Sequence, residues 1–273
     1  MPANVNVMSL VRPRSLKAAL SLLTSDPTLM PIAGCTDVYV GLHFGTMAQK
    51  RFIDLWSLQE LRGISVDRDV LRIGALSTYT EIIESKLVQK RVPMLVAAAR
   101  EVGGAQIQNR GTLGGNVANA SPAGDTLPVL AAAGARLVLR SNAGARTVPF
   151  DGFYTGYRTS VRKAEELITA IEIPRIDGTQ WWRKVGTRRA QAISKIMMAA
   201  VRGVEIRIAF GSVGPTVVLA KRAAEVLSRG GAIADARDAL RSDIAPIDDI
   251  RSTGEYRATV AGNLLEEFWT VTK

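Results

Sequence analysis

The sequence predicts an α/β or α+β protein built from two units. Three observations favour this class. Helical and strand-like hydrophobic patterns are mixed along the chain and joined by short links. Hydrophobic residues make up 47% of the 273 residues and charged residues 22%, which is typical of a packed protein and excludes a disordered one. Two domains of ordinary size fit this length.

The first unit should open with a helix over residues 15–23, because Leu16, Ala19, Leu20 and Leu23 share one helical face. Similar local signals predict the elements that follow as far as residue 140. These are strands at 28–33, 52–55, 64–66, 70–73 and 136–140, helical segments after capping boxes at 57–60 and 78–81, and helices over 93–102 and 126–133.

A cluster of Pro, Asp and Gly at 175–179 predicts a domain boundary. The chain then divides into residues 1–177, with two lobes of about 1–57 and 58–177, and residues 178–273. Strand patterns close the first unit at 166–173 and open the second. The second unit is predicted to contain strands at 180–185, 192–201 and 205–213, and helices at 217–229 and 252–269, the last after a capping box at Ser252–Glu255.

One cysteine, Cys35, and one histidine, His43, limit the chemistry. They exclude an intramolecular disulfide, a Cys-rich zinc site and an iron–sulfur cluster held by this chain alone. A Ser-His-Asp or Cys-His mechanism would have to use His43, which has no paired nucleophile motif. We therefore expect no metal site and name no catalytic residue, and we expect a bound cofactor to carry the chemistry.

The net charge of +10 is spread along the chain with no run of more than two basic residues. A basic surface suits acidic partners or an anionic dinucleotide, and no nucleic-acid-binding module is recognisable. No apolar run approaches the roughly 18 residues of a membrane span. The first residues lack the features of a signal peptide, so we expect a cytoplasmic protein.

Two glycine-containing loops are the candidate binding sites. Residues 109–122 resist an ordinary secondary-structure interpretation, and their Gly, Asn and Thr residues can form a nest of backbone amides for phosphate oxygens. Residues 33–37 form a glycine turn before a helix that Thr36 or Asp37 could cap, which is a ready anion site. Taken singly, a plain surface loop and a plain strand–helix junction explain these segments as well. Neither matches the Rossmann or P-loop spacing.

Segments in order along nearly the whole chain resemble the flavoprotein (medium) subunit of the molybdenum hydroxylases, the family of xanthine dehydrogenase and carbon monoxide dehydrogenase. Ala-Gly-Cys-Thr-Asp at 33–37 and Gln-Ile-Gln-Asn-Arg-Gly-Thr-Leu-Gly-Gly-Asn at 106–116 resemble its two FAD loops. The resemblance continues through residues 52–55, 118–125, 153–158, 165–174, 184–189 and 206–216.

The resemblance implies an α+β fold: a vanillyl-alcohol-oxidase-type (PCMH-like) FAD-binding domain, then a smaller C-terminal α+β domain with a three-stranded antiparallel sheet and helices. It implies that the FAD pyrophosphate lies between two groups of residues and that four further positions contact the cofactor. The first group is Ile32, Ala33, Gly34, Cys35, Thr36 and Asp37, the second is Gly111, Thr112, Leu113, Gly114, Gly115 and Asn116, and the four further positions are Asn119, Asp125, Ile168 and Lys184.

The implied function is electron transfer. A large molybdopterin subunit oxidises the substrate, a small subunit relays electrons through two [2Fe–2S] clusters, and this subunit passes them through FAD to NAD⁺, oxygen or another acceptor. The resemblance also implies a dimer of heterotrimers. Molybdopterin and the clusters are expected only on the partner subunits.

The chain departs from the family pattern at two places. Cys35 stands where the family usually has Gly, which removes one free backbone position and adds a thiol, and the link at 201–205 is short. Two alternatives stay open. One is a stand-alone flavoenzyme on the same fold, which would need an acid or base beside the flavin. The other is a cofactor-free scaffold or nucleic-acid-binding module, for which Cys35 is the supporting feature.

Overall fold

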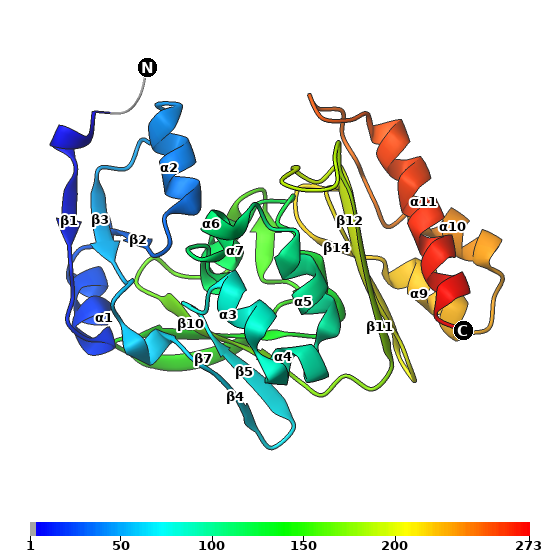
Figure 1. The fold of residues 1–273 in the computed structure, drawn as a ribbon, viewed down its shortest axis with the longest axis horizontal. Helices are drawn as coiled ribbons and strands as arrows, with labels where there is room; N and C mark the ends of the chain where they lie inside the picture. Colours follow the sequence, from blue (N-terminus) through cyan, green and yellow to red (C-terminus); the bar gives the residue numbers. More distant parts are fainter. Residues whose placement is uncertain (1–3) are drawn as a thin grey trace.

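Three sheets of three or more strands stand side by side in residues 4–273, which the computed structural model describes (Figure 1). The first two belong to the N-terminal part of the chain, and the third to the C-terminal part. No helix among these residues is both long and apolar enough to cross a membrane.

The first sheet is parallel and small, with the strand order β1-β3-β2. The elements of this lobe are η1 (Val5–Val7), β1 (Ser9–Val11), α1 (Leu16–Ser25), β2 (Met30–Ile32), α2 (Thr36–His43) and β3 (Arg51–Asp54). Ser15 caps α1 by accepting a hydrogen bond from the amide of Ala18. The four residues predicted on the inner face of α1 are buried, so this prediction is confirmed. Helix α2, in contrast, buries none of its side chains.

The second sheet is antiparallel, with the order β4-β5-β10-β6-β7. The predicted hairpin at 64–73 and the capping box at Thr78–Glu81 are confirmed. The elements of this lobe are η2 (Gln59–Leu61), β4 (Ile64–Asp67), β5 (Val70–Gly74), α3 (Tyr79–Glu84), α4 (Lys86–Arg91), α5 (Pro93–Arg100), α6 (Ala105–Gln108), α7 (Leu113–Asn119), α8 (Leu127–Ala132), β6 (Arg136–Ser141), β7 (Gly144–Pro149), β8 (Tyr154–Gly156), β9 (Thr159–Ser160) and β10 (Leu167–Ile173).

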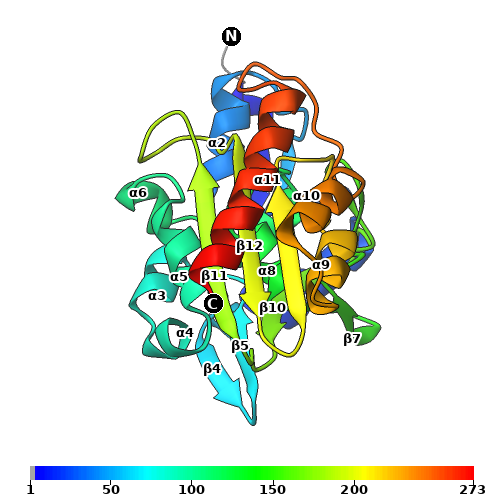
Figure 2. The same cartoon turned by 90° about the vertical axis from the view of Figure 1, so that its right-hand side faces the viewer.

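The third sheet forms the C-terminal part and has four strands in the order β11-β12-β13-β14, one more than the predicted three, because the short β14 pairs with β13. Its elements are β11 (Thr179–Val185), β12 (Ile196–Arg202), β13 (Ile206–Gly211), β14 (Val218–Leu219), α9 (Lys221–Ser228), α10 (Ile233–Arg241) and α11 (Gly254–Val271). Helices α9, α10 and α11 cover its outer face (Figure 2). Because strand residues alternate, Ala199 and Val201 of β12 face the core beneath α8, while Met198 and Ala200 face these helices.

Several predicted elements differ from the structure. Residues 57–60 do not form a capping box: η2 has no side-chain cap, and Glu60 Oε1 instead accepts from the amide of Leu16 at the start of α1. The predicted helix at 217–229 begins only at Lys221, because residues 218–219 pair with β13 as strand β14.

The last helix is capped by Thr253 and not by Ser252, since the Thr253 hydroxyl accepts from the amide of Tyr256. The stretch at 106–125 also contains regular structure, because α6 and α7 lie within it or overlap it. Strand β7 and helix α10 were not predicted.

Candidate functional site

The first glycine loop connects β2 to α2 and leaves backbone donors unpaired. Cys35 precedes the helix in the left-handed conformation (φ 62°, ψ 11°), with no side-chain cap. Neither Thr36 nor Asp37 caps α2, contrary to the prediction, because the helix already begins at Thr36. The amides of residues 34–38 donate no hydrogen bond to another described residue. These orphan donors at a helix start fit an anionic ligand.

The second loop is a capped helix start. The Thr112 hydroxyl accepts from the amide of Gly115 (3.0 Å), and the amides of Leu113, Gly114 and Asn116 donate to carbonyl groups. The side chain of Asn116 accepts from the Thr126 hydroxyl (2.7 Å). The loop is therefore fixed by these bonds, and its amides at 113–116 are already engaged, in contrast to the amides of residues 34–38.

The two loops touch backbone to backbone. A Cβ atom on Gly34 would lie 1.7 Å from the carbonyl oxygen of Arg110 and 3.2 Å from the nitrogen of Gly111. Only glycine fits at this junction. The contact brings the starts of α2 and α7 together although they are far apart in sequence. We call this contact the loop junction.

A polar clasp of Asp37, Asn119 and Arg158 crosses from α2 to the second lobe. Asn119 Nδ2 donates to Asp37 Oδ1 (2.9 Å), and Arg158 Nη1 donates to Asn119 Oδ1 (2.8 Å). Partial desolvation by the surrounding protein raises the pKa of Asp37, although its side chain still reaches solvent, while Arg158 and Asn119 act in the opposite direction. The predicted cofactor position Asn119 thus lies between the two lobes and links them.

Asp125 and Lys184, predicted separately, form a buried ion pair. Lys184 Nζ donates to Asp125 Oδ2 (2.7 Å) and to the carbonyl of Glu101 (3.1 Å). The Lys184 and Asp125 side chains are 4% and 10% exposed. Burial raises the pKa of Asp125, and the opposing effects of Lys184 and Ser194 reduce that shift. Ser194 Oγ donates to Asp125 Oδ1 (2.5 Å).

The sequence pattern gives no indication of Ser194 as a site residue or of the clasp role of Arg158. No local signal marks Ser194, which lies in the connection before β12 and meets Asp125 only through the fold. Ile168, the remaining predicted position, is buried in β10 within the core that also contains Leu113 and Val117 of α7.

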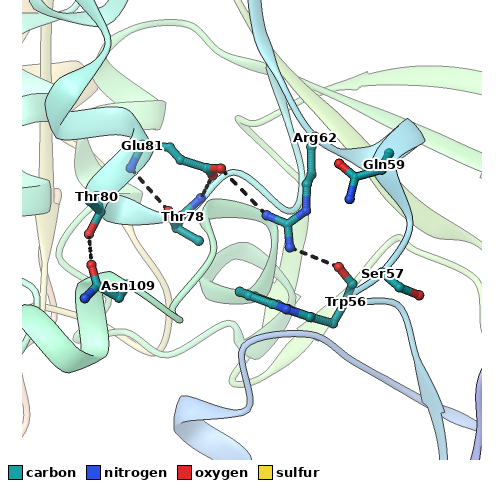
Figure 3. A pocket seen from close by; sticks show the side chains of 8 residues that line it. All are labelled: Trp56, Ser57, Gln59, Arg62, Thr78, Thr80, Glu81 and Asn109. Atoms are coloured by element: carbon teal, nitrogen blue, oxygen red, sulfur yellow. Dashed lines mark hydrogen bonds and ion pairs between the residues drawn. The ribbon is translucent and has the colours of Figure 1, made fainter.

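A separate hollow of about 560 Å³ lies beside the second loop (Figure 3). The Arg110 guanidinium lies 3.7 Å from the centre of the Trp56 ring, and Thr80 donates to Asn109 (2.6 Å). The residues that line the hollow are Trp56, Ser57, Gln59, Arg62, Thr78, Thr80, Glu81 and Asn109, none of them a predicted cofactor position. Several of these polar groups bond to one another or to the backbone.

Within residues 4–273 no three or more His, Cys, Asp or Glu side chains gather as a group that could hold a metal ion.

Comparison with known proteins identifies the two parts of the chain. Residues 6–176 match the FAD binding domain in molybdopterin dehydrogenase, and residues 182–272 match the CO dehydrogenase flavoprotein C-terminal domain. The xanthine dehydrogenase FAD-binding subunit of Escherichia coli O157:H7 is 31% identical over 262 residues, which cover 90% of this chain and 89% of that protein. The carbon monoxide dehydrogenase medium chain of Hydrogenophaga pseudoflava is 30% identical over 268 residues, with 93% of each chain covered.

Solved structures give the same result. A chain of the Hydrogenophaga pseudoflava carbon monoxide dehydrogenase that lacks the Mo-pyranopterin moiety superposes with a TM-score of 0.90 at 27% identity, covering 98% of this chain and 96% of that one. A chain of quinoline 2-oxidoreductase from Pseudomonas putida 86 gives a TM-score of 0.89 at 27% identity, with 97% and 96% covered. This chain therefore belongs to the FAD-binding subunits of the molybdenum hydroxylase family, which includes the xanthine and carbon monoxide dehydrogenases, and its cofactor is FAD.

Proposed function

We propose that this chain relays electrons from the [2Fe–2S] clusters of a partner subunit to NAD⁺, oxygen or another acceptor. The observation that carries the proposal is the loop junction, where the unpaired amides of residues 34–38 meet the second loop. Such a concentration of donors suits a pyrophosphate. Bound FAD supplies the redox chemistry, and the protein holds and orients it.

In this proposal each predicted position has a distinct task. The amides of residues 34–38 bind the phosphate oxygens, since those at 113–116 already donate within the protein. The second loop, Gly111 to Asn116, provides a rigid wall against which the first loop is fixed. Asp125 accepts hydrogen bonds from cofactor hydroxyls, and Lys184 neutralises its charge in the buried setting. Ile168 supplies an apolar surface for a ring.

The proposed assembly is a cytoplasmic dimer of heterotrimers with a large molybdopterin subunit and a small [2Fe–2S] subunit. It is supported by family membership, since the relatives are named as an FAD-binding subunit and a medium chain. It also agrees with a net charge of +10, which suits acidic partner surfaces.

Three side chains argue against a stand-alone flavoenzyme with its own acid–base chemistry. Tyr79 and Tyr154 lie near the second loop, and burial raises the already high pKa of both phenols, so neither can serve as a base at neutral pH. His43 is exposed at the last turn of α2, edge-on to Phe44.

The test starts with the visible absorption spectrum of the purified chain and the mass of any released cofactor. We expect stoichiometric FAD. Co-expression with the molybdopterin and [2Fe–2S] subunits should then give a complex in which substrate reduces the flavin, while the isolated chain turns over no substrate. Substrate-dependent flavin reduction by the isolated chain would contradict the relay role.

A further inference from the structure

Three buried polar residues of the C-terminal part lie behind Asp125 and have no task in the function proposed above. They are Ser194, Ser212 and Arg257, with residue exposures of 1%, 4% and 4%. Each belongs to a different segment: Ser194 precedes β12, Ser212 follows β13, and Arg257 lies in the first turns of α11. Hydrogen bonds connect them in series with Asp125.

The series begins at the carboxylate. Ser194 Oγ donates to Asp125 Oδ1 (2.5 Å), and Ser212 Oγ donates to the carbonyl of Ser194 (3.4 Å). The amide of Ser212 donates to the carbonyl of Pro122 (2.9 Å), three positions before Asp125. Arg257 Nη1 donates to the carbonyl of Ser212 (2.9 Å). Residue 212 therefore holds both Ser194 and the loop that carries Asp125.

Two unfavourable features meet at this residue. Ser212 has φ 63°, a left-handed conformation that is disfavoured for residues with a Cβ atom. Arg257 buries a guanidinium whose Nε has no partner among the described residues, although its Nη2 donates to Asp249 (2.7 Å). Replacing an entire buried ion pair by well-packed hydrophobic residues is often neutral or stabilising, so burial of this guanidinium does not by itself add stability. The left-handed backbone of Ser212 and the buried guanidinium of Arg257 that contacts it therefore indicate a functional role for this contact.

We propose that Ser194 and Arg257 are positioning residues for FAD that act through Asp125. The inference rests on the contact between Asp125 and FAD proposed above. Lys184 holds one carboxylate oxygen and Ser194 the other, so the carboxylate has a single orientation. Arg257 fixes Ser212, and Ser212 fixes Ser194 and the Pro122–Asp125 loop. Loss of either positioning residue leaves Asp125 held by Lys184 alone, so the orientation of its second oxygen is no longer fixed.

The test is a double-mutant cycle on FAD affinity, read from the quenching of flavin fluorescence on titrating the full apo chain with FAD. Ser194→Ala should raise the Kd about 10-fold, the value of one hydrogen bond to a charged group. In an Asp125→Asn background the same change should alter the Kd less than twofold, because Ser194 acts through the carboxylate. Arg257→Met should show the same dependence on background, with about a threefold effect.

Ser228→Ala is the matched control. It removes a part-buried hydroxyl hydrogen bond to the Ala224 carbonyl in α9, away from Asp125, and should leave the Kd unchanged. Thermal unfolding of the apo variants separates a folding defect from a loss of affinity. An equal effect of Ser194→Ala in both backgrounds, or no effect in either, would overturn the inference while leaving the FAD contact standing. Wild-type affinity in Asp125→Asn itself would overturn the proposed contact at Asp125.

Discussion

Replacing Gly34 by alanine is the sharpest test of the loop junction. The new Cβ would lie 1.7 Å from the Arg110 carbonyl oxygen, whereas real Cβ contacts are essentially never shorter than 3.0 Å. The two loops must therefore separate by about 1.3 Å, the difference between these distances. Both clashing atoms nearest to the Cβ are backbone, so no rotamer change can relieve the contact. The φ angle of Gly34 is not in the left-handed region, so alanine at this position introduces the steric clash without added backbone strain.

A displacement of this size exceeds the tolerance of a hydrogen bond, because a 2.9 Å contact lengthened by 1.3 Å is lost. Losing two amide–phosphate bonds, each contributing about 1.5–3 kcal/mol, weakens binding by at least about 3 kcal/mol. The Kd for FAD should rise about 100-fold or more.

The assay is titration of the apo chain with FAD, followed by flavin fluorescence. Gly41→Ala is the matched control within α2, where the closest atom to the new Cβ is the flexible end of Met47. It should bind FAD like the wild type. If Gly34→Ala binds FAD within threefold of the wild type, the junction does not position the phosphate donors and the reasoning fails.

Three further predictions concern neighbouring residues. Cys35→Gly should raise the free energy of unfolding by up to about 1 kcal/mol, because it removes left-handed strain, and FAD binding should be kept; lower stability in chemical denaturation would contradict this. Arg158→Ala should weaken FAD about 10-fold by releasing Asn119, whereas the exposed control Arg241→Ala should not; equal Kd values would exclude the clasp. Glu166→Gln should cost about 1–2 kcal/mol at pH 7, because the Arg146 guanidinium lowers the pKa of Glu166. The stability that this ion pair contributes is present above the ordinary carboxyl pKa of about 4.3 and is lost as the pH falls through the lowered value. The free energies of unfolding of the wild type and of Glu166→Gln, measured as a function of pH, should therefore converge in acid and stay apart in base.

Local signals were sufficient for much of the fold. The spacing of four leucine and alanine residues predicted α1, and Thr78 with Glu81 predicted the start of α3. Such signals involve residues within one or two turns, so the chain itself contains them. Helix α10 was missed although Ile233, Ala236 and Leu240 recur at i, i+3 and i+7, so its helical spacing is present in the sequence.

The site required contacts that no local pattern specifies. The sequence shows a glycine at residue 34, but not that its Cα lies against the backbone of Arg110. It shows an aspartate at 125, but not that a serine 69 residues later holds one of its oxygens. The sequence predicts that Cys35 removes a free backbone position, whereas in the structure Cys35 itself adopts the left-handed conformation that glycine favours.

Helix α2 has a consequence for the protein without its cofactor. Its eight residues bury no side chain, and Tyr39, Val40 and the adjoining Phe44 are 69%, 55% and 68% exposed. A helix this short is not stable in water by itself, so few intramolecular forces keep it folded. In hydrogen exchange its amides should open at a free energy well below that of global unfolding, and the proposed phosphate binding at its first turn would add directly to that opening energy. If the proposal holds, the cofactor stabilises the first lobe itself, and hydrogen-exchange protection of α2 should rise with the occupancy of the site.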